Sequence, residues 1–262
     1  MSLMFYLFLF LAGATVGFFS GLLGLGGGIL MFPLLLYLPP VLGFDQIPVK
    51  SITGLTMVQG FFASLSAMLF YRSQRLVNKS LVLSLGLSLF LSSLAGSLIS
   101  KTVPDKSLLF IFGALAFAAS AFMLTPRSYA EDDLTEDKVH FNRTVVMLIG
   151  VSIGFLIGLV GQGGAFIIIP VLLYVLKIPL RVTIGSTLAI GLFSSTAGLI
   201  GKMVTGQVPF QIAIALLMGS VPAAQLGSVI GRKTKVQFLR WLLAFIITVS
   251  AIKVWSDIFW PK

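Results

Sequence analysis

Two glycine-rich stretches, 137 residues apart, hold the residues of this chain that are best suited to binding a solute. Runs of glycine let the backbone leave helical geometry, and a helix that begins after such a break presents unpaired N–H groups and a positive dipole end. A helix end of this kind binds anions. The competing interpretation is close helix packing through small residues. The candidate anion-binding residues of the two stretches are Gly26, Gly27, Gly28, Gln162, Gly163 and Gly164.

The two stretches are copies of one pattern. Residues 21–37 and 158–174 agree at nine of seventeen positions, including a proline, Pro33 or Pro170, that follows each break. Glycine breaks inside apolar segments are costly in lipid, because the freed backbone groups need partners there. Two breaks in matching positions therefore favour a functional role. The copies differ where Leu25 in the first corresponds to Gln162 in the second, so only the second break adds a side-chain donor.

A basic residue opens an apolar segment in each copy, Lys50 in the first and Arg181 in the second. A cation at the start of a helix opposes the helix dipole. Anchoring at the membrane surface by a snorkelling side chain is one explanation. The alternative is that two cations at opposite mouths attract an anionic solute.

The segments that these residues open carry small and polar residues at helical spacing. Stripes of this kind are packing seams more often than ligand walls. The polar side chains on or beside such stripes that we select as possible solute contacts are Thr56, Gln59, Thr187, Ser194 and Gln225.

The composition is that of an integral membrane protein. Hydrophobic residues make up 57% of the 262 residues and charged residues 10%, whereas a soluble domain is about 25% charged. The net charge is +10. The basic residues lie mostly between or at the ends of apolar spans, where they fit the positive-inside rule and can contact anionic lipid head groups. We expect a multi-pass protein of the cell membrane, with the bilayer and a small anion as partners and no nucleic acid. The oligomeric state stays open, a homodimer included.

The apolar pattern predicts an all-α membrane protein of two homologous halves with four to five helices each, every half containing a glycine-broken helix and a half-helix. We assign residues 1–125 to the first transmembrane repeat, 126–142 to an acidic polar linker and 143–262 to the second repeat. The segments 28–38 and 165–177 are too short to cross roughly 30 Å of hydrocarbon. The expected helices cover 3–23, 28–38, 49–70, 79–100, 107–125, 143–160, 165–177, 181–203, 208–230 and 237–256.

The distribution of basic residues favours inverted halves. If the second half is flipped, twelve basic residues collect on one side of the membrane and six on the other, whereas eight simple crossings divide them equally. The positive-inside rule expects such a bias.

The scarcity of reactive and ionisable residues in the apolar spans disfavours several kinds of chemistry. The sequence has no cysteine, its single histidine, His140, lies in the acidic linker, and no Asp or Glu lies in the middle of an apolar span. A proton relay built on intramembrane carboxylates, a metal site and acid–base or nucleophilic catalysis are therefore not expected. We expect no cofactor and no enzymatic activity.

The order and spacing of these motifs resemble the sulfite exporter TauE/SafE family. The resemblance rests on the two glycine breaks, the proline after each, the basic residue and Thr/Gly helix that follow, and Gly227-Ser228 before a basic cluster. It implies a transporter for sulfite or organosulfonates in the cytoplasmic membrane of a bacterium or archaeon. Alternating access of an anion held between the two breaks is the expected mechanism. An anion channel is the alternative, and an intramembrane enzyme is a weaker one.

Overall fold

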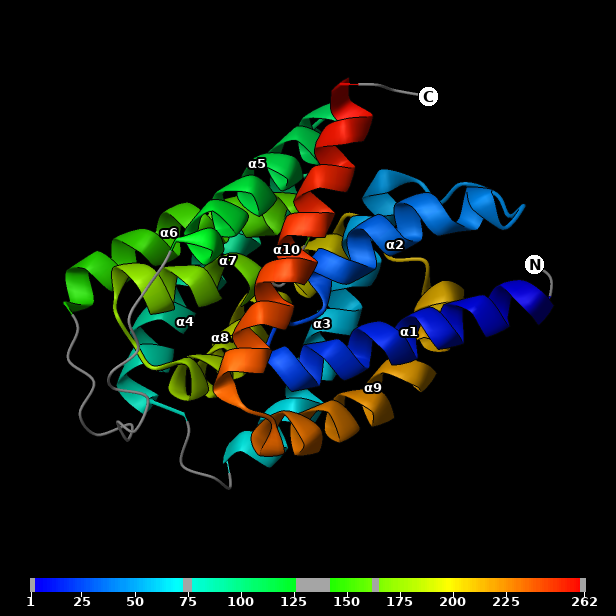
Figure 1. The fold of residues 1–262 in the computed structure, drawn as a ribbon. Helices are drawn as coiled ribbons and strands as arrows, with labels where there is room; N and C mark the ends of the chain where they lie inside the picture. Colours follow the sequence, from blue (N-terminus) through cyan, green and yellow to red (C-terminus); the bar gives the residue numbers. More distant parts are fainter. Residues whose placement is uncertain (1–2, 73–76, 126–141, 162–164, 260–262) are drawn as a thin grey trace.

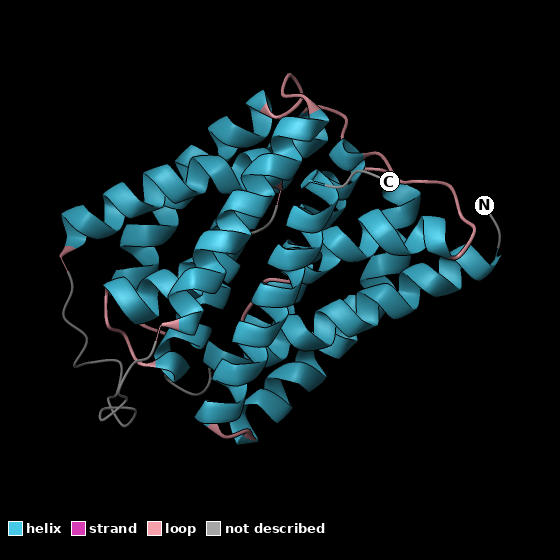
Figure 2. Ribbon diagram, turned by 45° about the horizontal axis from the view of Figure 1, so that its top comes forward, coloured by secondary structure: helices cyan, strands magenta, loops and turns pink. Residues whose placement is uncertain are grey.

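The structure is a computed structural model that describes the chain except residues 1–2, 73–76, 126–141, 162–164 and 260–262. The described residues form helices joined by loops (Figure 2). The predicted all-α fold is confirmed. The acidic linker falls almost entirely within 126–141 and so lies, with His140, outside the described residues.

The helices follow the order expected from the apolar pattern (Figure 1). Their bounds are α1 Leu3–Leu23, α2 Gly28–Val41, α3 Val49–Arg72, α4 Lys79–Ile99, α5 Asp105–Leu124, α6 Arg143–Val160, α7 Ala165–Pro170, α8 Leu180–Val204, α9 Phe210–Lys233 and α10 Val236–Phe259. In the described chain, seven helices are long and apolar enough to cross a bilayer, namely α1, α4, α5, α6, α8, α9 and α10. The helix α3 has 24 residues. The helices α2 and α7, which follow the two glycine breaks, are short, as predicted.

The second half-helix differs from its predicted form. It is α-helical only as far as Pro170 and continues as a π-helix over Val171–Val175. Proline has no N–H to donate to the carbonyl one turn back, which weakens the regular helical ladder at this point. The N–H of Leu176 then bonds to the carbonyl of Val171, five residues earlier, at 3.1 Å.

Two pairs of helices run parallel and in close contact along glycine seams. On α1, a Cβ at Gly13 or Gly17 would meet the backbone of Leu216 or Ser220 on α9. On α6, a Cβ at Gly158 would meet the backbone of Ser93 on α4. Figure 1 shows α1 and α9 lying together along their length. Small residues allow this approach of backbones in a membrane protein.

Contacts between loops and helix termini define two ends of the bundle. At the first, which we name the Lys50 end, the ring of Phe5 on α1 lies 5.2 Å from that of Phe44 in the α2–α3 loop. Lys50 Nζ at the start of α3 donates to the carbonyl of Lys101, just after α4, at 2.7 Å.

The opposite end, which we name the Lys79 end, holds the starts of α4, α6 and α8. The N–H of Asn78 donates to the Ser186 hydroxyl at 3.1 Å, and Arg143 contacts the Ser80 hydroxyl at 3.4 Å. The helices α1 and α6, which open the two proposed halves, thus begin at opposite ends. This direction agrees with inverted halves, which we retain as a proposal.

The two half-helices share one aromatic core. The ring of Phe112 on α5 stacks on Phe32 of α2, with centroids 4.6 Å apart, and lies 6.3 Å from Phe166 of α7. All three side chains are fully buried. Aromatic burial of this size fixes the two half-helices against a common partner, and their N-termini therefore face the same interior region.

Candidate functional site

The first glycine break reverses the chain inside the bundle. Gly24, Gly26 and Gly27 have φ angles of 71°, 62° and 83°, a region that only glycine enters without strain. The carbonyl of Gly27 accepts the N–H of Met31 at 2.9 Å, which starts α2. Gly28, the first residue of α2, is buried. The break thus places the start of α2, a helix of 14 residues, in the interior of the bundle.

Gln59 of α3 lies directly against this helix start. Its side chain is fully buried, and a Cβ at Gly27 would overlap the Gln59 carboxamide. Neither the amide nitrogen nor the amide oxygen of Gln59 has a hydrogen-bond partner among the described residues. A buried polar group without a partner is costly and rare in folded proteins. An amide left in this state beside a helix N-terminus is equipped to bind a polar solute.

The start of the second half-helix approaches the same place. A Cβ at Gly26 would lie 3.6 Å from the Cβ of Ala165, the first residue of α7, and 3.7 Å from the Ser64 hydroxyl. Ser64 is buried, and its hydroxyl has no partner in the described part of the chain. We name Gly26, Gly27, Gln59, Ser64 and Ala165 the central cluster. Ser64 was not selected from the sequence, where it is one serine among many.

The second break is described only at its flanks, because Gln162, Gly163 and Gly164 lie outside the described residues. At its first flank, Gly161 has a φ angle of 77°. The Thr56 hydroxyl bonds to the Gly161 carbonyl, and a Cβ at Gly161 would collide with Thr53. Thr53, Thr56 and Gln59 all lie on α3, so this one helix contacts both breaks.

The remaining predicted residues do not all join this cluster. Thr187 and Ser194 are buried on α8, and their hydroxyls bond to carbonyls of their own helix, at 2.7 Å for Thr187 to Thr183 and 3.2 Å for Ser194 to Gly191. Gln225 is exposed on α9.

The two predicted basic residues lie at helix starts. Lys50 is half-buried at the bundle end named after it. Arg181 is the second residue of α8, and its side chain lies outside the described part of the structure.

A buried lysine that the sequence analysis did not select lies next to the second break. Lys202 of α8 is fully buried, and its ammonium nitrogen contacts Thr53, Ser100, Gln207 and the carbonyl of Leu159. In the sequence it stands close to the end of an apolar span, where lysines usually snorkel to the membrane surface. The structure turns it inward instead.

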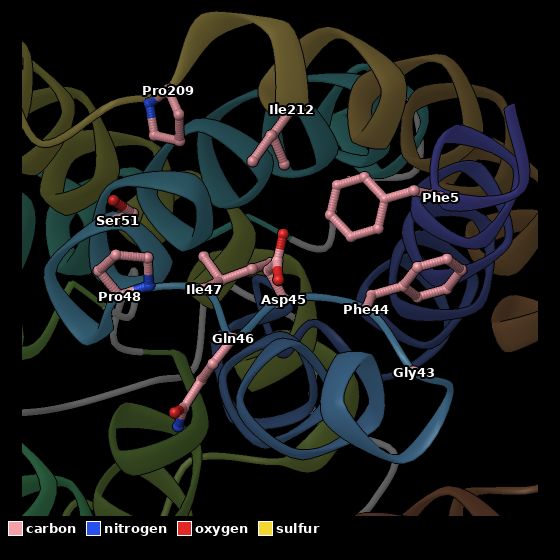
Figure 3. A pocket seen from close by; sticks show the side chains of 10 residues that line it. All are labelled: Phe5, Gly43, Phe44, Asp45, Gln46, Ile47, Pro48, Ser51, Pro209 and Ile212. Atoms are coloured by element: carbon pink, nitrogen blue, oxygen red, sulfur yellow. The ribbon is translucent and has the colours of Figure 1, made fainter. Parts of the chain in front are cut away.

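A surface cavity of about 370 Å³ opens at the Lys50 end (Figure 3). It lies between the start of α1, the α2–α3 loop and the start of α9, with Ser51 of α3 in its wall. Figure 3 shows Gln46 pointing away from Phe5 and Asp45. Both polar and apolar residues line the cavity. It lies beside the first turn of α3, the helix that carries Thr53, Thr56 and Gln59.

Comparison with known proteins identifies the family. The sequence profile described as "Sulfite exporter TauE/SafE" matches residues 9–254, and the chain belongs to this family. The chain is 27% identical to the probable membrane transporter protein YunE of Bacillus subtilis, over 97% of this chain and 99% of that protein. A probable membrane transporter protein of Methanocaldococcus jannaschii is 26% identical over 93% of both chains. One of Xylella fastidiosa is 29% identical over 94% of both. No solved structure matches significantly. The protein is a multi-pass membrane transporter.

Proposed function

We propose that this TauE/SafE transporter moves small sulfur-containing oxyanions, sulfite or organosulfonates, without converting them chemically. The anion binds between the two glycine breaks. The N-terminus of α2 at Gly26–Gly28 supplies N–H groups on one side. On the other side, residues 162–164 supply the second break, with Gln162 as a side-chain donor. Thr56 and Gln59 face the anion from α3.

The observation that carries this proposal is the state of Gln59. Its buried amide has no partner among the described residues and lies against Gly27, the N-cap of α2. The amide N–H groups and the helix N-terminus both favour an oxygen-rich anion. A bound sulfonate would satisfy the donors that the protein leaves open there. The unpartnered Ser64 hydroxyl supports the same assignment.

Alternating access requires rigid bodies, and the glycine seams indicate which helices they contain. The parallel seams join α1 to α9 and α4 to α6, so each seam pairs a helix of one proposed half with a helix of the other. We therefore propose that α1 with α9 and α4 with α6 move as two bodies around α3 and α8. This arrangement fits two inverted repeats with a substrate site near the middle of the membrane.

Uptake by proteoliposomes tests the function. We expect saturable uptake of radiolabelled sulfite, methanesulfonate or sulfoacetate, and accelerated exchange when the same unlabelled anion is present inside. Uptake that follows the electrochemical gradient without saturating would indicate a channel instead. Uptake no greater than that of empty vesicles for all three anions would contradict the proposal.

A further inference from the structure

The buried ammonium of Lys202 lies in a shell of oxygen atoms contributed by both proposed halves. Thr53 and Ser100 accept from it at 2.8 and 2.7 Å, Gln207 at 3.1 Å and the Leu159 carbonyl at 3.2 Å. These partners lie on α3, after α4, on α6 and in the α8–α9 loop. No solvent reaches the side chain, whose exposed fraction is 0%.

The surrounding hydrogen bonds are arranged to accept from a charged lysine. The Thr53 hydroxyl donates its own hydrogen to the Lys50 carbonyl at 2.7 Å, and the Ser100 hydroxyl donates to the Ser97 carbonyl at 2.6 Å. The Gln207 amide nitrogen donates to Ser100 at 3.1 Å. All four partners therefore offer Lys202 an acceptor. An ammonium has three donors and no acceptor, so it fits this shell, whereas the lone pair of a neutral amine would face oxygen atoms.

No carboxylate balances this charge in the described part of the protein. The acidic residues described there are Asp45, Asp105 and Asp257, and the one ion pair they form joins Asp257 to the exposed Lys253. A buried, uncompensated charge costs several kcal/mol, and ionisable residues inside membrane spans mark functional sites. Lys202 is therefore a candidate functional residue in the interior of the bundle.

The charge lies less than two turns of α3 from the central cluster. Thr53, which contacts Lys202, precedes Gln59 by six residues on α3, a distance of about 9 Å along the helix axis. At this separation, a charge in a protein interior changes the affinity for a single opposite charge by about tenfold. Lys202 is thus close enough to act on an anion at Gln59 without touching it.

We propose that Lys202 is the residue that gives the transport site its selectivity for anions. Its ammonium acts as a fixed countercharge beside the second break, while the uncharged donors of the central cluster bind and orient the oxyanion. This assignment rests on the proposed function and names the residue that sets the charge preference of the same site.

The test compares Lys202→Gln with Lys202→Arg and uses substrates of different charge. Half-saturation concentrations are measured in proteoliposomes for methanesulfonate, which has one negative charge, and sulfoacetate, which has two. Because Coulomb energy is proportional to ligand charge, the glutamine variant should raise the half-saturation concentration about tenfold for the first and about 100-fold for the second. The arginine variant should stay within about threefold of wild type for both.

Two further variants keep the result interpretable. Lys253→Gln removes an exposed cation and should leave both constants unchanged. Lys202→Met removes the charge and introduces no polar group that would need a buried hydrogen-bond partner. This variant replaces Lys202→Gln if the glutamine variant does not fold. Half-saturation also does not depend on how much carrier is active.

The possible outcomes separate the two proposals. If the neutral variants weaken both anions by the same factor, Lys202 acts through local structure and its assignment to charge selectivity is wrong. Unchanged constants in the neutral variants overturn it as well. If wild-type protein takes up neither of these anions nor sulfite, the proposed function itself fails, and this proposal fails with it.

Discussion

The two glycine breaks share their spacing but are packed against different walls. At the first, Gly24 lies against the apolar side chain of Ile184 on α8. At the second, Gly161 lies against Thr53 and accepts from Thr56 on α3, and Lys202 bonds to the carbonyl of Leu159 two residues earlier. Gly24 and Gly161, which match in the sequence, therefore have different surroundings. The first break provides a helix start and an open amide, and the second lies beside the charge.

The difference extends to the two ends of the bundle. At the Lys50 end, the hydrogen-bond shell of Lys202 joins four segments. At the Lys79 end, Gly231 of α9 lies against the backbone of Leu22 on α1. The buried ammonium and its acceptors thus lie at the Lys50 end. An anion moving through the protein would meet the fixed positive charge at the Lys50 end.

The largest expected effect comes from filling the first break. Gly27→Ala adds a Cβ at a φ of 83° that overlaps the Gln59 carboxamide, so the amide must leave its place against α2. We expect uptake to fall by at least tenfold. Gly43→Ala is the matched control, because Gly43 has a φ of 78° and nothing within 4 Å of the added Cβ. It introduces similar backbone strain, of order 1 kcal/mol, and should keep near-normal uptake. Equal losses would mean that strain, and not the position of Gln59, decides the outcome.

Removing the open amide should have the next largest effect. In Gln59→Leu, the half-saturation concentration should rise about tenfold, since at the lower end of its range one hydrogen bond to a charged ligand is worth roughly 1.5 kcal/mol. The melting temperature without substrate should stay equal or rise, because an unpartnered buried polar group is removed. The exposed amide of Gln225 offers the control, Gln225→Leu, which should alter neither quantity. A Gln59→Leu protein that melts much earlier and binds normally would assign the amide to structure.

The smallest effect distinguishes the two threonines that the repeat aligns. Thr56→Val loses the bond from α3 to the Gly161 carbonyl, and we expect uptake to fall about fivefold, which corresponds to one hydrogen bond of about 1 kcal/mol. Thr187→Val loses only bonds within α8 and should change uptake less than twofold. Similar losses in both variants, measured as initial uptake rates, would indicate that the two breaks are equivalent after all.

Much of the fold could be predicted because it depends on local pattern. Apolar spans, glycine breaks and the short segment after each break determine the helices, and most predicted helix bounds lie within a few residues of the observed ones. Gln59 could be selected because it stands one turn after Thr56 on a polar face. The π-helix after Pro170 could not be predicted, since Pro33, which has the same place after the first break, lies within a regular α-helix.

Lys202 was not selected from the sequence, because the direction of its side chain depends on tertiary packing. A lysine near the end of an apolar helix has the same sequence signature whether it snorkels outward or turns inward. Lys202 turns inward because Thr53, Ser100 and Gln207 supply acceptors from three other segments. Thr53 and Ser100 are far from Lys202 in the sequence, and no local pattern connects them. Ser64 was missed for the same reason, since its importance arises from its proximity to Gly26.

The location of a bound anion tests the central claim most directly. A structure determined with 2-bromoethanesulfonate, with the bromine located by anomalous scattering, should place the sulfonate beside Gly27 and Gln59 and the bromine a few ångströms away from them. The sulfonate should lose this site in Gln59→Leu and keep it in Gln225→Leu. Bromine found only in the surface cavity beside Asp45, with the Gly27–Gln59 region unoccupied, would contradict the account.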